Sequence, residues 1–205
     1  MVIKQIQVKN FRLLKEFTME MENELSLVIG KNNVGKTSLL VILDKFLNQG
    51  DRKGFQYNDF NLDFRCQLKD LIEKEVVDDT KYKEIGIQLR LLIEYDDHDD
   101  LEYISPINNF LGLGFDYILT YDMYVNLKNA YQKFVEHEKS KEEKSRENGG
   151  EYTAKTLDDF LNSKQSNYFV TIRKSILINK TDGTFIEEQY INLKDATNFR
   201  LCDVI

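Results

Sequence analysis

The stretch VIGKNNVGKTSLL, residues 28–40, contains a loop with two glycines, followed by a lysine and two hydroxyl residues. It fits the pattern G-x-x-x-x-G-K-[ST] of phosphate-binding loops. Gly30 and Gly35 let the backbone turn without a Cβ in the way, so that successive N–H groups point at phosphate oxygens. Lys36 is placed to reach the β- and γ-phosphates, and the Thr37 hydroxyl is placed to bind Mg²⁺. The pattern therefore predicts a site for ATP with Mg²⁺.

The elements around this loop agree with the prediction. ELSLVI, residues 24–29, reads as a buried strand, and TSLLVILDKFL, residues 37–47, has the apolar spacing of a helix. The positive N-terminal end of that helix favours phosphate. Lys36 is the residue expected to act in catalysis. The alternative to a phosphate-binding loop is an ordinary strand–turn–helix, in which Gly30 and Gly35 serve only the turn. The predicted nucleotide-binding residues in the loop are Gly30, Lys31, Asn32, Asn33, Val34, Gly35, Lys36, Thr37 and Ser38.

Composition sets bounds on the class of protein. The chain has 205 residues, of which 41% are hydrophobic and 31% charged, which suits a soluble globular protein of one or two domains. It has no apolar run of membrane-spanning length and no signal-peptide pattern, so we expect a cytoplasmic protein without a membrane partner. Cys66 and Cys202 are expected to be reduced thiols. The net charge of −7 gives no basic signature, so any DNA contact requires a local patch or parts outside these residues.

The residues before the loop carry a family resemblance. VIKQIQVKNFRLLKEFTMEM, residues 2–21, alternates apolar and polar residues on both sides of a turn near Asn10, which predicts an antiparallel strand pair. Together with the loop, this string resembles the N-terminus of ABC-type ATPases of the SMC and RecF kind. It is most similar to the OLD-family ATP-dependent endonucleases, which are AAA family ATPases. The similarity is dense over residues 1–48 and thin afterwards, apart from NDF at residues 58–60.

The resemblance implies a fold and several partners. The expected class is α/β: a P-loop NTPase whose ABC-ATPase-like N-terminal lobe has an antiparallel β layer and a helical insertion. Arg12 matches an arginine near the nucleotide in related repair ATPases; the alternative is a solvated charge at a strand end. A glutamine loop in this family helps to hold Mg²⁺, and Gln56, Gln67 and Gln88 are candidates. The full-length protein would act on DNA, and its ATPase heads would pair as a homodimer.

The acidic part of a hydrolytic site is missing from the sequence. Hydrolysis in such ATPases needs a buried apolar strand that ends in Asp-Glu. Residues 85–97 read instead as a half-exposed antiparallel strand, and Asp122 after residues 115–121 is a weak candidate without a following glutamate. No LSGG-like signature helix is present either. The chain is therefore expected to be the first half of an ATPase, which binds ATP without efficient hydrolysis.

The expected organisation has three regions. Residues 1–97 form the N-terminal lobe, residues 98–165 a mainly helical insertion, and residues 166–205 a β-hairpin that returns to the lobe. Strands are predicted at residues 85–95, 167–179 and 184–193, with a possible strand at 115–122 and a short helix at 67–75. The charged run that ends at Gly150 is expected to be a frayed helix or a disordered loop; an arm that contacts DNA or a partner is the alternative.

Other functions are weighed against the ATPase. NKTD at residues 179–182 fits the base-recognition string of a GTPase, but it reads as a hairpin turn and no D-x-x-G motif precedes it. A small-molecule kinase would need an arginine-rich lid, which is not evident. A nucleotide-gated binding module is hard to separate from an ATPase by sequence alone.

YDDHDD, residues 95–100, is expected to be a solvated acidic turn and not a metal site, because adjacent side chains point in diverging directions. Whether a Toprim nuclease follows is open.

Overall fold

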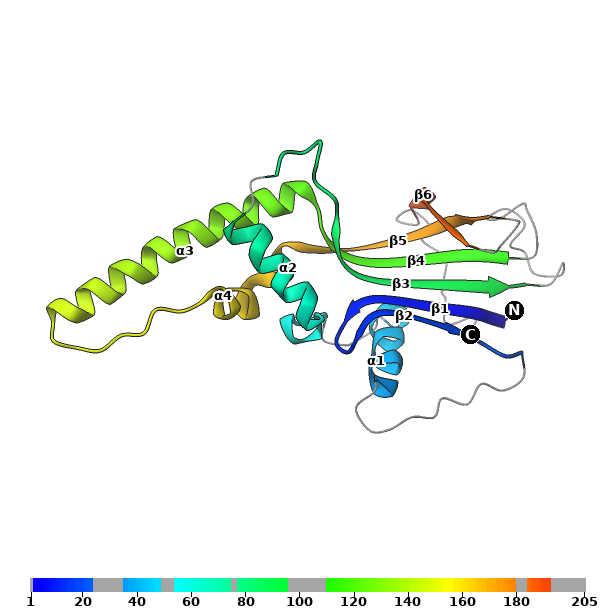
Figure 1. The fold of residues 1–205 in the computed structure, drawn as a ribbon, viewed down its shortest axis with the longest axis horizontal. Coiled ribbons are helices and arrows are strands. Elements are labelled where there is room, and N and C mark those ends of the chain that lie inside the picture. The colour runs from blue at the N-terminus through cyan, green and yellow to red at the C-terminus, as the bar shows by residue number, and fades with distance from the viewer. Residues whose placement is uncertain are drawn as a thin grey trace.

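A six-stranded antiparallel sheet organises the chain in a computed structural model (Figure 1). The structure describes residues 2–23, 35–48, 54–74, 77–95, 110–179 and 184–192. The strand order is β2-β1-β3-β4-β5-β6, and all neighbouring strands are antiparallel. The strands are β1 (Val2–Phe11), β2 (Leu14–Glu20), β3 (Ile85–Glu94), β4 (Phe110–Leu119), β5 (Phe169–Ile178) and β6 (Phe185–Asn192).

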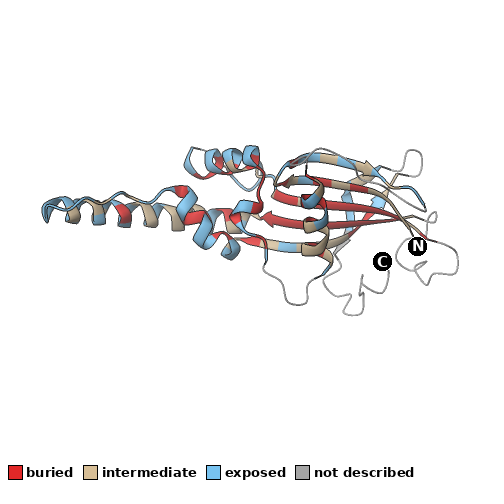
Figure 2. Ribbon diagram, turned by 90° about the horizontal axis from the view of Figure 1, so that it is seen from below, coloured by how far each residue is buried: buried red, intermediate tan, exposed pale blue. Residues whose placement is uncertain are grey.

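One face of the sheet is covered by α1 (Lys36–Leu47), the helix that follows the predicted phosphate-binding loop. The apolar residues of the strands alternate, so that every second side chain points at the helix. Leu39, Ile42 and Phe46 pack on this face, and the Phe46 ring lies 5.8 Å from the Phe115 ring of β4. Figure 2 shows the buried residues concentrated along the central strands beneath the helices. Burial of each such side chain contributes about 1.5–3 kcal/mol, so the helix is held by its apolar face.

Three further helices and two short 3₁₀ turns are described between the strands. The turns are η1 (Tyr57–Asp59) and η2 (Gln165–Asn167), and α2 (Leu62–Glu73) begins at an N-cap where the Asn61 side chain accepts a hydrogen bond from the Asp63 amide. Such a cap satisfies an amide that has no partner within the helix. The short helix predicted at residues 67–75 is thus longer and starts earlier than expected.

The predicted antiparallel strands are confirmed, with one correction to their environment. β3 was expected to be half-exposed because polar residues alternate with apolar ones, yet most of its residues are buried. Arg90 on this strand is only 3% exposed, since carboxylates from β4 and β6 surround its guanidinium. The possible strand at 115–122 proves to be β4, which begins and ends earlier than the prediction.

A long helical arm extends beyond the end of the sheet (Figure 1). It consists of α3 (Tyr121–Glu147), a returning segment, and α4 (Leu157–Lys164). The expectation that the charged run is frayed or disordered is wrong, because α3 continues through it. Glu138, 3% exposed, binds the returning segment: it accepts hydrogen bonds from the Tyr152 hydroxyl at 2.6 Å and the Lys155 amide at 3.1 Å.

Candidate functional site

The described part of the predicted loop is its last turn into α1. Residues 30–34 lie outside the described residues. Gly35 precedes the helix with φ 99° and ψ 2°, a left-handed conformation that glycine adopts without steric cost. Lys36 and Thr37 then occupy the first turn, where Thr37 is exposed and Ser38 is buried. The first turn of α1 thus carries an ammonium, on Lys36, and an exposed hydroxyl residue, Thr37, which are the residue types that the phosphate-binding pattern requires.

The turn between β1 and β2 packs directly against Gly35. A Cβ built on Gly35 would lie 2.8 Å from Leu14 Cδ2 and 3.9 Å from Leu13 Cβ. The turn itself contains two residues in the left-handed region, Asn10 with φ 61° and Arg12 with φ 48°. Asparagine tolerates this conformation, whereas arginine rarely adopts it. The turn that contacts Gly35 through Leu13 and Leu14 thus contains a residue, Arg12, in an unfavourable backbone conformation.

Arg12 is held in this conformation by an ion pair with Asp59. Arg12 Nε lies 2.9 Å and Nη2 2.8 Å from Asp59 Oδ1. The other carboxylate oxygen of Asp59 lies 3.1 Å from Lys45 Nζ on α1 and accepts a hydrogen bond from the Gln56 amide at 3.0 Å. Asp59 is 3% exposed, so its charge is buried but compensated. Arg12 is therefore neither a fully solvated charge nor an unpartnered one.

Backbone contacts join the same two segments. The Arg12 amide donates to the Asp59 carbonyl at 2.8 Å, and the Asn61 side chain donates to the Arg12 carbonyl at 2.6 Å. The Asn61 amide donates to the Asn10 carbonyl at 2.9 Å, and Phe11 and Phe60 form an isolated β-bridge. The NDF string, weak as a sequence signal, thus supplies the partner of the KNFR string. NDF is singled out in the sequence analysis, but without a role for Asp59, because nothing in the local pattern indicates which cation this carboxylate would meet.

The other predicted candidates lie on elements other than α1, the helix that begins at Lys36. Gln56 is exposed beside η1, Gln67 is exposed on α2, and Gln88 is half-buried on β3. Asp122 is exposed in the first turn of α3, not at the end of a buried strand. Within the described residues, no group of three His, Cys, Asp or Glu side chains could hold a metal ion.

Further sequence candidates fall partly outside the described residues. These are residues 96–100 of the acidic run, residues 180–182 of NKTD, and Cys202. The Asn179 amide donates to the Thr184 carbonyl at 2.8 Å, at the base of the connection between β5 and β6. NKTD therefore starts in a hairpin connection, as its sequence pattern predicted. Cys66, the other cysteine, is a free and exposed thiol on α2.

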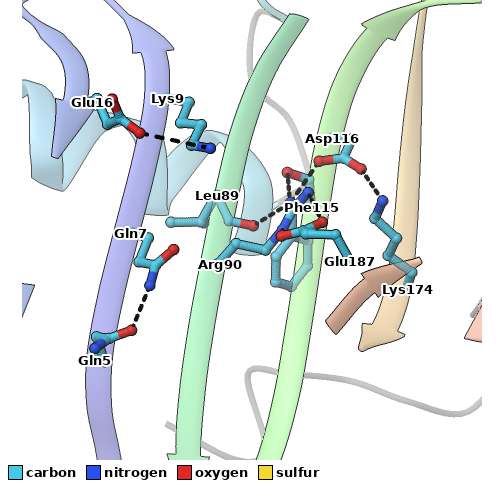
Figure 3. Close-up of polar contacts among 10 residues, drawn as sticks. All are labelled: Gln5, Gln7, Lys9, Glu16, Leu89, Arg90, Phe115, Asp116, Lys174 and Glu187. Carbon is cyan, nitrogen blue, oxygen red and sulfur yellow. Dashed lines mark hydrogen bonds and ion pairs between the residues drawn. The ribbon is translucent and has the colours of Figure 1, made fainter. Parts of the chain in front are cut away.

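A second buried charge cluster lies on the sheet face opposite α1 (Figure 3). Arg90 donates two hydrogen bonds to Glu187, at 2.7 and 2.9 Å, and one to Asp116 at 2.6 Å. Lys174 contacts the other oxygen of Asp116 at 2.7 Å. Burial acts to lower the pKa of Arg90, but its bonds to Glu187 and Asp116 outweigh burial and raise it. Two carboxylates balance two cations here, which indicates a structural cluster.

The G-x-x-x-x-G-K-[ST] pattern of the sequence ends where Gly35 enters the N-terminus of α1, and this helix packs on the β layer, an arrangement typical of P-loop nucleoside triphosphatases. Residues 1–202 match the AAA ATPase domain, and the chain belongs to this family. Membership of a family of ATPases implies nucleotide binding. No curated protein matches the chain significantly. Among the described residues, no helix is long and apolar enough to cross a membrane.

Proposed function

We propose that this chain is the ATP-binding part of an ATPase head in a DNA-processing, DNA-repair or defence nuclease system of the OLD kind. The observation that carries the proposal is the left-handed Gly35 that leads directly into Lys36 and Thr37 at the α1 N-terminus. The dense resemblance over residues 1–48 to OLD-family ATPases supports the nuclease context. The DNA substrate would be engaged by the full-length protein.

The proposed roles follow from the chemistry of each residue. Lys36 binds the β- and γ-phosphates and stabilises charge that develops on the transferred phosphoryl group. The Thr37 hydroxyl is the proposed Mg²⁺ ligand, and amides of residues 30–38 surround the phosphates. Arg12 is a further nucleotide-binding residue in this proposal. Mg²⁺, when bound, would neutralise phosphate charge.

Hydrolysis in this proposal requires a second half-site. A P-loop leaves the γ-phosphate facing water, and turnover needs an acidic residue for the attacking water and donors on the far side. We propose that a C-terminal half contributes the acidic strand and that a second ATPase head contributes the donors. In this proposal, residues 1–97 are the lobe, residues 98–165 the insertion, and residues 166–205 the returning hairpin.

The experiment is nucleotide titration of the Lys36→Ala variant. Affinity for ATP with Mg²⁺ should fall at least tenfold, since a charge-assisted hydrogen bond contributes about 1.5–3 kcal/mol. Lys69→Ala is the matched control, because Lys69 is an exposed helical lysine on α2. ATP should bind more tightly than GTP. Unchanged affinity in Lys36→Ala would refute the nucleotide site, and a preference for GTP would favour a GTPase.

A further inference from the structure

Asp59 links two segments that meet at the nucleotide site. One is the β1–β2 turn, through Arg12; the other is α1, through Lys45. The side chains of Asp59 and Lys45 are 5% and 13% exposed, so both sit in a region where charge interactions are little screened by water. A buried carboxylate without these cations would be costly, which makes the relative position of the three groups well defined.

The turn that Asp59 holds is the one that packs on Gly35. Leu13 and Leu14 follow Arg12 directly. A Cβ added to Gly35 would lie only 2.8 Å from Leu14 Cδ2, so the turn leaves no room for a side chain there. Lys45 lies in the last turn of α1, the helix whose first residue is Lys36. Lys45 also donates to the Gly54 carbonyl at 3.0 Å, which brings the segment after α1 back to the helix. Asp59 thus contacts groups connected to both sides of Gly35.

We propose that Asp59 is a positioning residue for nucleotide binding: it holds the β1–β2 turn and α1 in the relative arrangement that shapes the end of the phosphate-binding loop. This inference rests on the proposed function. A loop shaped before the ligand arrives binds more tightly, because the ordering cost is not subtracted from the binding free energy. Loss of the Asp59 charge removes the side-chain link between Arg12 and Lys45. The backbone hydrogen bond from Arg12 to Asp59 remains, but the turn and α1 are then held together less firmly, and so is the contact of Leu14 with Gly35.

The chain offers a matched control for a buried carboxylate. Asp116 is 1% exposed and, like Asp59, contacts one arginine and one lysine, Arg90 and Lys174. It lies on the sheet face opposite α1. Asp59→Asn and Asp116→Asn should therefore both lower the thermal midpoint, whereas only Asp59→Asn should alter the nucleotide site. A purely structural role for Asp59 would leave the two variants alike.

The measurement is the Kd for ATP with Mg²⁺, taken well below the thermal midpoint of each variant. We expect a rise of about tenfold in Asp59→Asn, about threefold in Lys45→Met, and less than twofold in Asp116→Asn. Lys36→Ala is run alongside to test the proposed function separately.

Each outcome decides the inference. If Lys36→Ala weakens ATP binding but Asp59→Asn stays within twofold of the native Kd, Asp59 is not a positioning residue while the proposed function stands. Equal weakening by Asp59→Asn and Asp116→Asn overturns it as well. If Asp59→Asn does not fold, Lys45→Met decides instead, and a Kd within twofold of the native value overturns the inference. An unchanged Kd in Lys36→Ala removes the proposed function itself.

Discussion

Arg90 on β3 and Glu187 on β6 form two parallel hydrogen bonds, although the residues are separated by 97 positions and by two intervening strands. Glu187 reaches back over the sheet face opposite α1, and the same guanidinium holds Asp116. Burial tends to raise the pKa of Glu187, but the Arg90 contacts lower it. The last described strand is thus fastened to the centre of the sheet by charge.

Removal of Arg90 should destabilise the fold more than removal of Glu187. Arg90→Leu leaves Asp116 buried with one cation fewer, which costs about 3–5 kcal/mol of unfolding free energy. Glu187→Gln should cost about 1 kcal/mol or less, because half of the Glu187 side chain is exposed to water. Urea denaturation of both variants measures this difference. Equal losses would mean that Asp116 does not depend on Arg90.

Gly35→Ala should destabilise the protein and weaken ATP binding. Its φ of +99° is unfavourable for a residue with a Cβ, at about 1–2 kcal/mol, and the added Cβ would press on Leu14 Cδ2. Gly54→Ala is the control, since no atom lies within 4 Å of a Cβ at that position. Denaturation and nucleotide titration of the two variants should separate them. Similar behaviour would contradict the close packing of the turn on the loop.

The returning segment of the arm should detach at acid pH. Hydrogen bonds from Tyr152 and Lys155, and the Lys141 ammonium, lower the pKa of Glu138 to about 2. Because the folded pKa lies below the ordinary value of about 4.3, the carboxylate stabilises the arm above that value, and the effect is lost as pH falls towards 2. The protection factor of the Lys155 amide in hydrogen exchange reports this loss.

Glu138→Gln should reduce that protection already at neutral pH, because a neutral amide is a weaker acceptor than a carboxylate. Glu136→Gln is the control, as Glu136 is exposed on the same helix. A Lys155 protection factor that is constant between pH 7 and pH 2 would show that Glu138 does not fasten the segment.

The 205-residue chain by itself should release phosphate from ATP no faster than its Lys36→Ala variant. Its candidate acid, Asp122, is exposed in the first turn of α3, and the described residues include no metal-binding group of three. A steady-state phosphate-release assay with ATP and Mg²⁺ tests this. Robust turnover that depends on Lys36 would reveal an acid that the described residues do not show.

ATP should also fail to drive this chain into a head-to-head dimer, since its sequence contains no LSGG-like signature motif. Light scattering with and without ATP and Mg²⁺ makes the comparison. A longer chain that includes a C-terminal half should dimerise with ATP. A tight dimer of the 205-residue chain alone that appears only with ATP, and disappears in Lys36→Ala, would mean that the composite site is already complete.

Local patterns in the sequence determined the helix from Lys36 and the antiparallel strands, and they predict the phosphate-binding loop. Each depends on residues a few positions apart: two glycines and a lysine, or apolar side chains at a period of two. The matched AAA ATPase domain agrees with these patterns. The charged half of α3 was predicted to be frayed or disordered, and this prediction is wrong. A run of charged residues does not show that a returning segment will bind Glu138.

Only the tertiary structure decided the partners of the buried charges. Arg12 and Asp59 are 47 positions apart, and Arg90 and Glu187 are 97 apart. The spacing within each pair does not follow the period of a strand or a helix. The sequence therefore shows each of these residues only as a polar residue on a strand or near a turn. Chain folding brings them together because a buried charge is stable only beside an opposite one. This requirement concerns which residues are close in space, and the separation of two residues along the sequence does not show whether they are.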